Sequence, residues 1–386
     1  MRHFDFLDAS VRSQLFEVAP GSFERDSDPT LLAVALGATL YTPATAANLA
    51  ARVESQANAG VTSMVLCLED AIADDHVEVG EANVVEQLAA HHAGGHRGPL
   101  LFVRVRHPDQ ITDLAARLGD AVEVLSGFVL PKFSAACGQA YLQAMDAVQA
   151  ETGTRLYAMP VLEHSEVIHR ETRGQALADA HALLLAHRDR VLAVRIGVTD
   201  LSSAYGLRRS HDLTVYDVRI VAEVIADIVN VFGRADGSGF AITGPVWEYF
   251  TSGERIFKPR LRETIFTDHD ESGLRGQLIA RDLDGLIREV ELDKANGLTG
   301  KTVIHPSHVP AVHALQVVTH EEYQDACDIV GADLAGGVMA SGYRNKMNEV
   351  KPHSAWAHRT MARAQVFGVA APDVSFVELL AASVLR

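Results

Sequence analysis

Charged side chains stand at the ends of short apolar runs along the chain, where they could carry acid–base or metal chemistry. Glu69 and Asp70 follow SMVLCL, Arg104 follows LLFV, and Lys132 follows GFVLP. The remaining run ends carry Thr42, Glu163, Asp200, Pro245 and His305. A single residue of this kind is usually a solvated loop charge. Its recurrence at most of the run ends indicates one shared site.

The carboxylates in this set outnumber the cations. Glu69, Asp70, Glu163 and Asp200 would repel one another in a concave site unless a cation lay between them. Mg²⁺ prefers oxygen ligands and usually takes one or two carboxylates. We predict Glu163 and Asp200, at the ends of neighbouring runs, as the Mg²⁺ ligands. The alternative is that each caps the helix that follows it.

Arg104 and Lys132 are the cations expected at this site. The guanidinium fork of Arg104 suits a bidentate substrate carboxylate, whereas the alternative is an internal salt bridge to Glu69 or Asp70. Lys132 could form a Schiff base, stabilise charge or make a structural ion pair. Beside a metal site, the Schiff-base role is the least necessary.

The apolar runs that must position these residues alternate with longer segments of helical period. Eight runs are expected as strands, at residues 37–43, 63–70, 100–105, 127–132, 155–163, 191–200, 239–245 and 301–306. Near-continuous apolar strands are typical of parallel sheets covered on both faces. The pattern predicts an α/β fold, a (β/α)8 TIM barrel, with the polar run ends on one rim. A doubly wound open sheet is the competing architecture, but its polar residues would gather at one switch point.

The domain plan follows from the same pattern. We expect an N-terminal extension at residues 1–35, a barrel at 36–318 and a helical C-terminal appendage at 319–386. Residues 246–275 look like an insertion after the seventh strand, where a barrel would hold a lid or an interface element over its active site.

Composition limits the classes of partner. The formal net charge of −16 argues against a nucleic-acid partner. No apolar run approaches the roughly 18 residues of a membrane span, and the start of the chain has no signal-peptide core. Three cysteines without a CxxC pair favour neither a disulfide framework nor a zinc site. We expect a soluble cytoplasmic protein.

Two motifs are rejected as functional signals. GLTGKT at residues 297–302 imitates the end of a phosphate-binding loop, but it lacks the leading glycine and precedes a strand instead of a helix. His164 and His169 lack the HExxH spacing of a zinc site, so we expect them to be structural.

Several of these segments together resemble the citrate lyase β-subunit-like, or HpcH/HpaI aldolase, superfamily. The resemblance runs through LCLEDA (66–71), FVRV (102–105), VLPK (129–132), PVLE (160–163), IGVTDL (196–201) and GKTVIHPSHV (300–309). It implies a Mg²⁺-dependent TIM barrel that makes or breaks a carbon–carbon bond next to a carboxylate, commonly in an acyl-CoA thioester.

By this resemblance, Glu163 and Asp200 bind the metal, Arg104 binds the substrate carboxylate, and Glu69 with Asp70 lines the pocket. Gly197, Val198 and Thr199 are expected at the substrate. Members are often trimers or hexamers in which a C-terminal segment covers a neighbour's barrel, so Glu349 is a candidate base acting across subunits. The segment YTPATAAN (41–48) departs from the family's first loop, which usually contains a PG pair.

We therefore expect a Mg²⁺-dependent carbon–carbon lyase acting on a 2-oxo or 2-hydroxy acid or its acyl-CoA ester. A pyruvate-type aldolase that uses free acids is a second hypothesis. A non-catalytic barrel that keeps the metal and acid pocket as a scaffold is a third.

Overall fold

The computed structural model describes residues 1–95, 98–250, 283–332 and 336–384. Eight parallel strands form a closed barrel in chain order, as predicted. They are β2 (Ala38–Pro43), β3 (Ser63–Cys67), β4 (Leu100–Arg104), β5 (Leu125–Leu130), β6 (Tyr157–Leu162), β7 (Val194–Ile196), β8 (Ile242–Trp247) and β9 (Thr299–Val303). β2 pairs with β9 through Ala38 and Lys301, which closes the ring.

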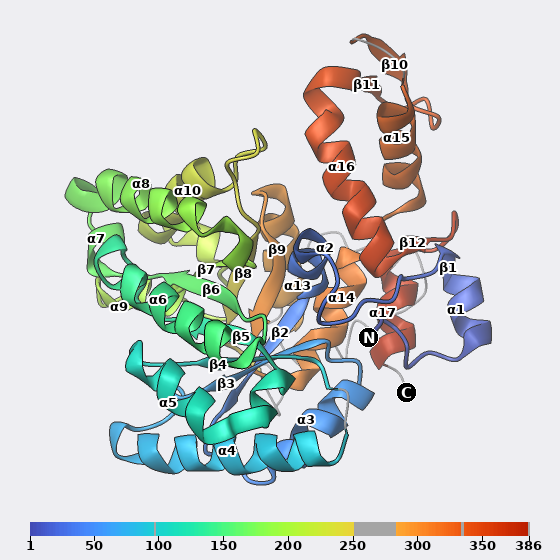
Figure 1. Ribbon diagram of the computed structural model, residues 1–386. Helices are drawn as coiled ribbons and strands as arrows, with labels where there is room; N and C mark the ends of the chain where they lie inside the picture. The colour runs from blue at the N-terminus through green and yellow to red at the C-terminus, as the bar shows by residue number, and fades with distance from the viewer. Residues whose placement is uncertain (96–97, 251–282, 333–335, 385–386) are drawn as a thin grey trace.

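Helices cover the outside of the barrel (Figure 1). They are α3 (Leu49–Asn58), α4 (Val77–Ala93), α5 (Asp109–Leu118), α6 (Ala135–Thr152), α7 (Ser165–Ile168), α8 (Arg170–Ala186), α9 (Val198–Ser203), α10 (Arg219–Phe232), α13 (Leu283–Ala295) and α14 (Val309–Gln316). Short 3₁₀ turns lie at Asp74–His76, Gly119–Val124, Arg188–Arg190, Val215–Asp217 and Pro306–His308. Every residue of β3, β5 and β6 is buried, as expected of strands between a packed interior and helices.

Local chemistry fixes where the helices begin and end. α6 starts because the Ser134 hydroxyl accepts a hydrogen bond from the Cys137 amide, and it stops at Gly153, whose φ of 70° an L side chain rarely adopts. The backbone is thereby released into β6. The turn before α6 places Lys132 at the barrel rim.

The predicted strand at residues 191–200 is wrong in its second half. The strand β7 ends at Ile196, and Val198–Ser203 forms the short helix α9, so Asp200 lies in a helical turn and not at a strand end. The chain can turn at Gly197 because there is no side chain to meet Glu163. A Cβ there would lie 1.9 Å from Glu163 Oε2. Asp200 still remains at the rim.

The rejection of a phosphate-binding loop is supported by the position of Lys301. It lies within β9 and is fully buried, and its Nζ is 2.7 Å from Glu289 Oε1 and 2.6 Å from Asp293 Oδ2. Both carboxylates belong to α13, so this lysine ties the helix to the barrel wall. It has no free amine for a phosphate.

Segments at the two ends of the chain meet outside the barrel. The N-terminal part contains α1 (Ala9–Leu15), β1 (Phe16–Val18) and α2 (Pro29–Ala35), and β1 pairs antiparallel with β12 (Val369–Ala370). α15 (His320–Gly331) and α16 (Val350–Phe367) form an arm that projects from the barrel, and α17 (Phe376–Val384) follows (Figure 1). The hairpin of β10 (Val338–Ala340) and β11 (Met347–Glu349) caps the arm, where only helix was expected.

Two further points bear on the sequence predictions. The predicted insertion at residues 246–275 lies, beyond residue 250, outside the described residues. Of the helices that the structure describes, none has both the length and the apolar character needed to cross a membrane.

A buried histidine beneath the barrel makes stability depend on pH. His313 Nε2 accepts a hydrogen bond from the Ala38 amide at 3.2 Å, and burial lowers the pKa of His313 to about 3. The unfolded chain, with an ordinary histidine pKa near 6.5, therefore binds more protons than the folded chain between these two values. We expect His313 to contribute stability above pH 6.5 that is lost as the pH falls towards 3.

Urea unfolding at pH 7, 6 and 5 measures this contribution. Below pH 6.5, His313 adds about 1.4 kcal/mol per pH unit to the fall in the free energy of unfolding. His313→Asn lowers stability at pH 7 but makes that fall less steep by about this amount. An equally steep fall in the variant contradicts the assignment.

Candidate active site

Five of the predicted site residues lie at the carboxyl ends of four neighbouring barrel strands. Glu69 and Asp70 follow β3, Arg104 ends β4, Lys132 follows β5, and Glu163 follows β6. Hydrogen bonds and ion pairs connect all five. The strands therefore assemble these residues into one cluster on the rim where barrel enzymes hold their active sites.

Arg104 lies at the centre of this cluster. Its terminal nitrogen Nη2 is 2.8 Å from Glu69 Oε2, 2.9 Å from Glu163 Oε1 and 3.3 Å from Asp70 Oδ2. Burial disfavours the charge, but the opposite charge of Glu163 and other anions around it raises the pKa of Arg104. The internal salt bridge that the sequence left open is thus present.

The same arginine keeps unused donor capacity. Its Nε is buried and has no hydrogen-bond partner among the described residues. An unpaired buried donor costs about 1–3 kcal/mol, and an acceptor from a bound ligand would remove that cost. Arg104 can therefore hold the carboxylates together and still donate to a substrate.

Lys132 is held by the same carboxylates through its side chain and its backbone. Its Nζ lies 2.8 Å from Glu69 Oε1, and its amide donates to Glu163 Oε1 at 3.1 Å. Its φ of 47° is unusual for a residue with a side chain, and such strain is typical of functional sites. The hydrogen bond that Lys132 donates to Glu69 raises the pKa of Lys132, which opposes the neutral amine that a Schiff base needs.

Glu69 and Asp70 are adjacent carboxylates with different proton affinities. The Asp70 amide donates to Glu69 Oε2 at 2.8 Å. Burial works against the charge on Glu69, but hydrogen bonding and the charges of Arg104 and Lys132 outweigh it and lower the pKa of Glu69 to about 2. Burial and the neighbouring Glu69 raise the pKa of Asp70 to about 6. Asp70 is the better proton carrier near neutral pH.

Glu163 has the electrostatics of a cation ligand. Only 4% of the residue is exposed, and burial, followed by the negative charge of Asp200, raises its pKa to about 7 against the attraction of Arg104. The hydrogen bonds that it accepts from described residues fall on Oε1, which leaves Oε2 for another partner. A divalent cation between Glu163 and Asp200 would relieve the repulsion between them.

Mg²⁺ fits this donor set, although the protein offers few ligands. Among the described residues, no group of three or more histidine, cysteine, aspartate or glutamate side chains is placed to hold a metal ion. Mg²⁺ sites commonly use only one or two carboxylates, with water or substrate oxygens in the other positions. Glu163 and Asp200 would supply the two carboxylates.

The other predicted residues lie beside the cluster or away from it. Gly197 adjoins Glu163, whereas Val198 is buried and Thr199 is exposed, so the role of all three at a substrate stays a prediction. His305 turns its Nδ1 to the Ser307 hydroxyl at 2.7 Å and stacks on Phe250. Glu349 ends β11 at the far end of the arm (Figure 1), so its predicted role in a neighbouring subunit stays a prediction.

A cavity of about 650 Å³ opens beside Glu69 and Lys132. Arg106, Cys137, Tyr141 and His164 also line it, and sequence reasoning had not placed any of them there. Arg106 donates to the carbonyls of Leu68 and Glu69, and Tyr141 donates to the carbonyl of Arg106. These contacts fix the loop that carries Glu69 and leave room for a substrate beyond the carboxylates.

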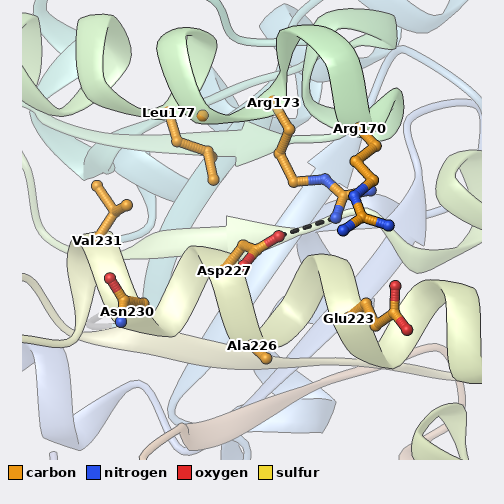
Figure 2. A pocket seen from close by; sticks show the side chains of 9 residues that line it. Arg170, Arg173, Leu177, Glu223, Ala226, Asp227, Asn230 and Val231 are labelled. Atoms are coloured by element: carbon orange, nitrogen blue, oxygen red, sulfur yellow. Dashed lines mark hydrogen bonds and ion pairs between the residues drawn. The ribbon is translucent and has the colours of Figure 1, made fainter.

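A second hollow, of about 610 Å³, lies between α8 and α10 on the outside of the barrel (Figure 2). Arg173 crosses it to reach Asp227 at 2.8 Å and donates to the carbonyls of Val167 and Ile168. These contacts tie α7, α8 and α10 together. None of the predicted site residues lies in this hollow, so we assign it to packing.

Sequence reasoning also passed over Arg195 and Tyr41. Arg195 belongs to β7 and is 2% exposed, and its guanidinium carbon lies 5.3 Å from the centre of the Tyr41 ring. The available signal was a single charge inside an otherwise apolar strand, VLAVRIG. Such a charge is rare in a barrel interior and calls for a partner.

Solved structures of similar fold include two citrate lyase-like proteins. A citrate lyase from Burkholderia xenovorans LB400 shares 17% identity, with a TM-score of 0.60 and coverage of 91% of this chain and 96% of that one. Protein CitE from Mycobacterium tuberculosis, in complex with magnesium, acetoacetate and coenzyme A, shares 19% identity, with a TM-score of 0.51 and coverage of 86% and 99%. At such identities the likeness shows the fold. A comparison with curated proteins gave no match.

A family model provides the assignment that these structures do not. Residues 30–369 match the family described as the C-C bond lyase of the TIM-barrel fold. This agrees with the predicted resemblance to the citrate lyase β-subunit-like superfamily, which also implies a TIM-barrel lyase. The chain belongs to the TIM-barrel family of carbon–carbon bond lyases.

Proposed function

We propose that the protein is a Mg²⁺-dependent lyase that cleaves a carbon–carbon bond in a 2-oxo or 2-hydroxy acid or its acyl-CoA ester. The observation that carries the proposal is the buried carboxylate of Glu163. It is held on one oxygen by Arg104 and Lys132, faces the charge of Asp200, and stands at the rim of a lyase-family barrel.

The bound metal would supply positive charge to the carboxylate of the substrate and its adjacent oxygen. Arg104 stabilises negative charge on the fragment that keeps the electrons of the broken bond, because it is cationic and its Nε has no partner among the described residues. Asp70 accepts the proton of the substrate hydroxyl that stands on the carbon next to the breaking bond, so that this carbon becomes a carbonyl. The electrons of the broken bond form an enolate on the other fragment. Asp70 then returns the proton to the enolate carbon. Protons therefore balance over one cycle. Glu349 of another subunit remains a second candidate for the base.

Lys132 acts as a charge at the mouth of the site in this proposal. Its side chain is half exposed and its ammonium group is bound to Glu69, so it can attract an anionic substrate without forming a covalent bond. The cavity next to it would receive the part of the substrate that leaves.

Two observations bear on whether the substrate is a CoA thioester or a free acid. The CitE structure contains acetoacetate and coenzyme A, which supports an acyl-CoA substrate. The first loop, YTPATAAN (41–48), lacks the family's PG pair, which argues against CoA recognition. A trimeric or hexameric assembly and a cytoplasmic location remain predictions.

Replacing either proposed ligand should weaken Mg²⁺ binding. We expect Glu163→Gln and Asp200→Asn each to raise the Kd for Mg²⁺ about tenfold or more in isothermal titration calorimetry, because each removes one of two anionic ligands. Circular dichroism checks that the fold is kept. Glu166→Gln, in the same cavity wall but outside the cluster, is the matched control. If Glu163→Gln and Asp200→Asn both bind Mg²⁺ with wild-type affinity, the metal-site assignment is wrong.

Lys132 should not become covalently attached to a 2-oxo acid. Incubation with pyruvate or oxaloacetate and borohydride is expected to leave the protein mass unchanged, since its contact with Glu69 keeps the amine protonated. Mass spectrometry of the intact protein and of its peptides makes the measurement. A borohydride-stable adduct on Lys132 would show that the enzyme uses Schiff-base chemistry.

Ligand-induced stabilisation separates the acyl-CoA lyase from the free-acid aldolase. With Mg²⁺ present, thermal unfolding is followed with acetyl-CoA, free coenzyme A, pyruvate and oxaloacetate. We expect a rise in Tm with at least one of them that is lost in Glu163→Gln. A larger rise with the CoA compounds supports a thioester substrate, and a rise with the free acids alone supports the aldolase. If wild type and Glu163→Gln respond equally, the proposed site does not bind these ligands.

The scaffold hypothesis is kept as a second candidate because of the altered first loop. It predicts ligand binding without turnover. Cleavage of any of these acids or thioesters that disappears in Glu163→Gln excludes it.

A further inference from the structure

Arg195 is a buried cation that has no carboxylate partner among the described residues. It is 2% exposed, its Nη2 donates to Thr302 Oγ1 at 2.5 Å, and its Nη1 lies 3.6 Å from Met159 Sδ. Within the described part of the chain, no carboxylate lies within ion-pair distance of it. Burying an unpaired charge costs several kcal/mol, so an apolar residue would fill this space with less penalty.

Arg195 also lies close to a second cation. The positive charge of Arg104 acts on Arg195 and adds to the cost of keeping it charged there. One terminal nitrogen of Arg104 contacts three carboxylates. Two guanidinium groups under one rim, with one already engaged, point to an anion that binds from outside the chain.

Tyr41 connects Arg195 to the site. Tyr41 is half-buried on β2, and its ring lies 5.3 Å from the guanidinium carbon of Arg195. Arg195, Arg104 and Glu163 all act electrostatically on the phenol, and its burial raises its pKa, so the hydroxyl keeps its proton. It is therefore a hydrogen-bond donor beside the carboxylate cluster.

A purely structural role for the pair explains less. Packing accounts for the aromatic ring and for the length of the arginine, and the hydrogen bond that Arg195 donates to Tyr41 uses the phenol oxygen as an acceptor, but none of these contacts uses the hydroxyl proton. A cation against the ring makes the hydroxyl a stronger donor, because it favours charge separation towards the phenolate. That property matters only if the hydroxyl meets an acceptor.

We propose that Tyr41 and Arg195 form an anion-binding floor of the active site, in which the Tyr41 hydroxyl donates a hydrogen bond to the carboxylate or enolate oxygen of a small planar 2-oxo acid. Arg195 is the positioning residue: it holds the Tyr41 ring and makes the Tyr41 hydroxyl a stronger hydrogen-bond donor. No proton is transferred. The proposal rests on the proposed lyase function and adds two residues that bind the acid substrate from the barrel interior.

Oxalate is a suitable probe because it is a planar dianion with the adjacent oxygens of an enolised 2-oxo acid. Its Kd is measured by calorimetry with saturating Mg²⁺, and the Kd of Mg²⁺ is measured separately. Tyr41→Phe removes the hydroxyl and keeps the ring against Arg195. Arg195→Met removes the charge, and Arg195→Lys keeps it without the planar fork. Tyr157→Phe, which alters a tyrosine at the start of β6 whose ring has the Arg155 guanidinium carbon 5.0 Å from its centre, is the matched control.

We expect Tyr41→Phe and Arg195→Met to weaken oxalate binding about tenfold or more while the Kd of Mg²⁺ changes less than about threefold. Arg195→Lys should recover part of the loss, and Tyr157→Phe should match wild type. If Arg195→Met does not fold, Tyr41→Phe still decides the question, because its packing is preserved.

Wild-type affinity for oxalate in Tyr41→Phe would overturn the proposal, as would a wild-type protein that binds no oxalate. Repeating the titration in EDTA separates this failure from that of the metal site. If Glu163 holds no Mg²⁺, the proposed function fails, yet the floor still predicts weaker oxalate binding in Tyr41→Phe than in wild type.

Discussion

The contact between Arg104 and Glu163 is the interaction on which the rest of the site depends. Both groups are nearly buried, and Arg104 also reaches Glu69 and Asp70 through the same nitrogen. Removing one member of a buried ion pair typically costs about 3–5 kcal/mol, because the other is left charged and unpaired. Four barrel strands deliver these residues, so the closed barrel and the charge cluster stabilise one another.

The cluster carries more negative than positive charge, and this imbalance determines what it can bind. Glu163 keeps one oxygen free of hydrogen bonds from described residues and faces Asp200, which favours a metal cation. Arg195, in the barrel interior, is positive and has no carboxylate partner among the described residues, which favours an anion. A carboxylate substrate bound together with Mg²⁺ would satisfy both demands in the same space.

Much of this arrangement could be predicted from sequence because a parallel strand leaves a simple signature. Apolar runs that end in Glu69, Arg104, Lys132 and Glu163 predict one rim as soon as the strands are read as a barrel. Asp200 was placed at the rim for partly the wrong reason, since it lies in α9 and not at a strand end. The rim position was correct because Gly197 turns the chain at the point where β7 ends.

The missed features depend on contacts across the barrel, which no local pattern reveals. Arg195 was counted as part of an apolar strand, although its partners lie on β2, β6 and β9. The sequence left open whether Arg104 meets a substrate or internal carboxylates, and only the structure shows that three carboxylates converge on one nitrogen.

An anomalous difference map from a Mn²⁺-soaked crystal tests the central claim, that Glu163 and Asp200 hold the metal, most directly. The account predicts a peak between the carboxylates of Glu163 and Asp200, within coordination distance of both. An ordered ion elsewhere with none between these carboxylates would contradict it.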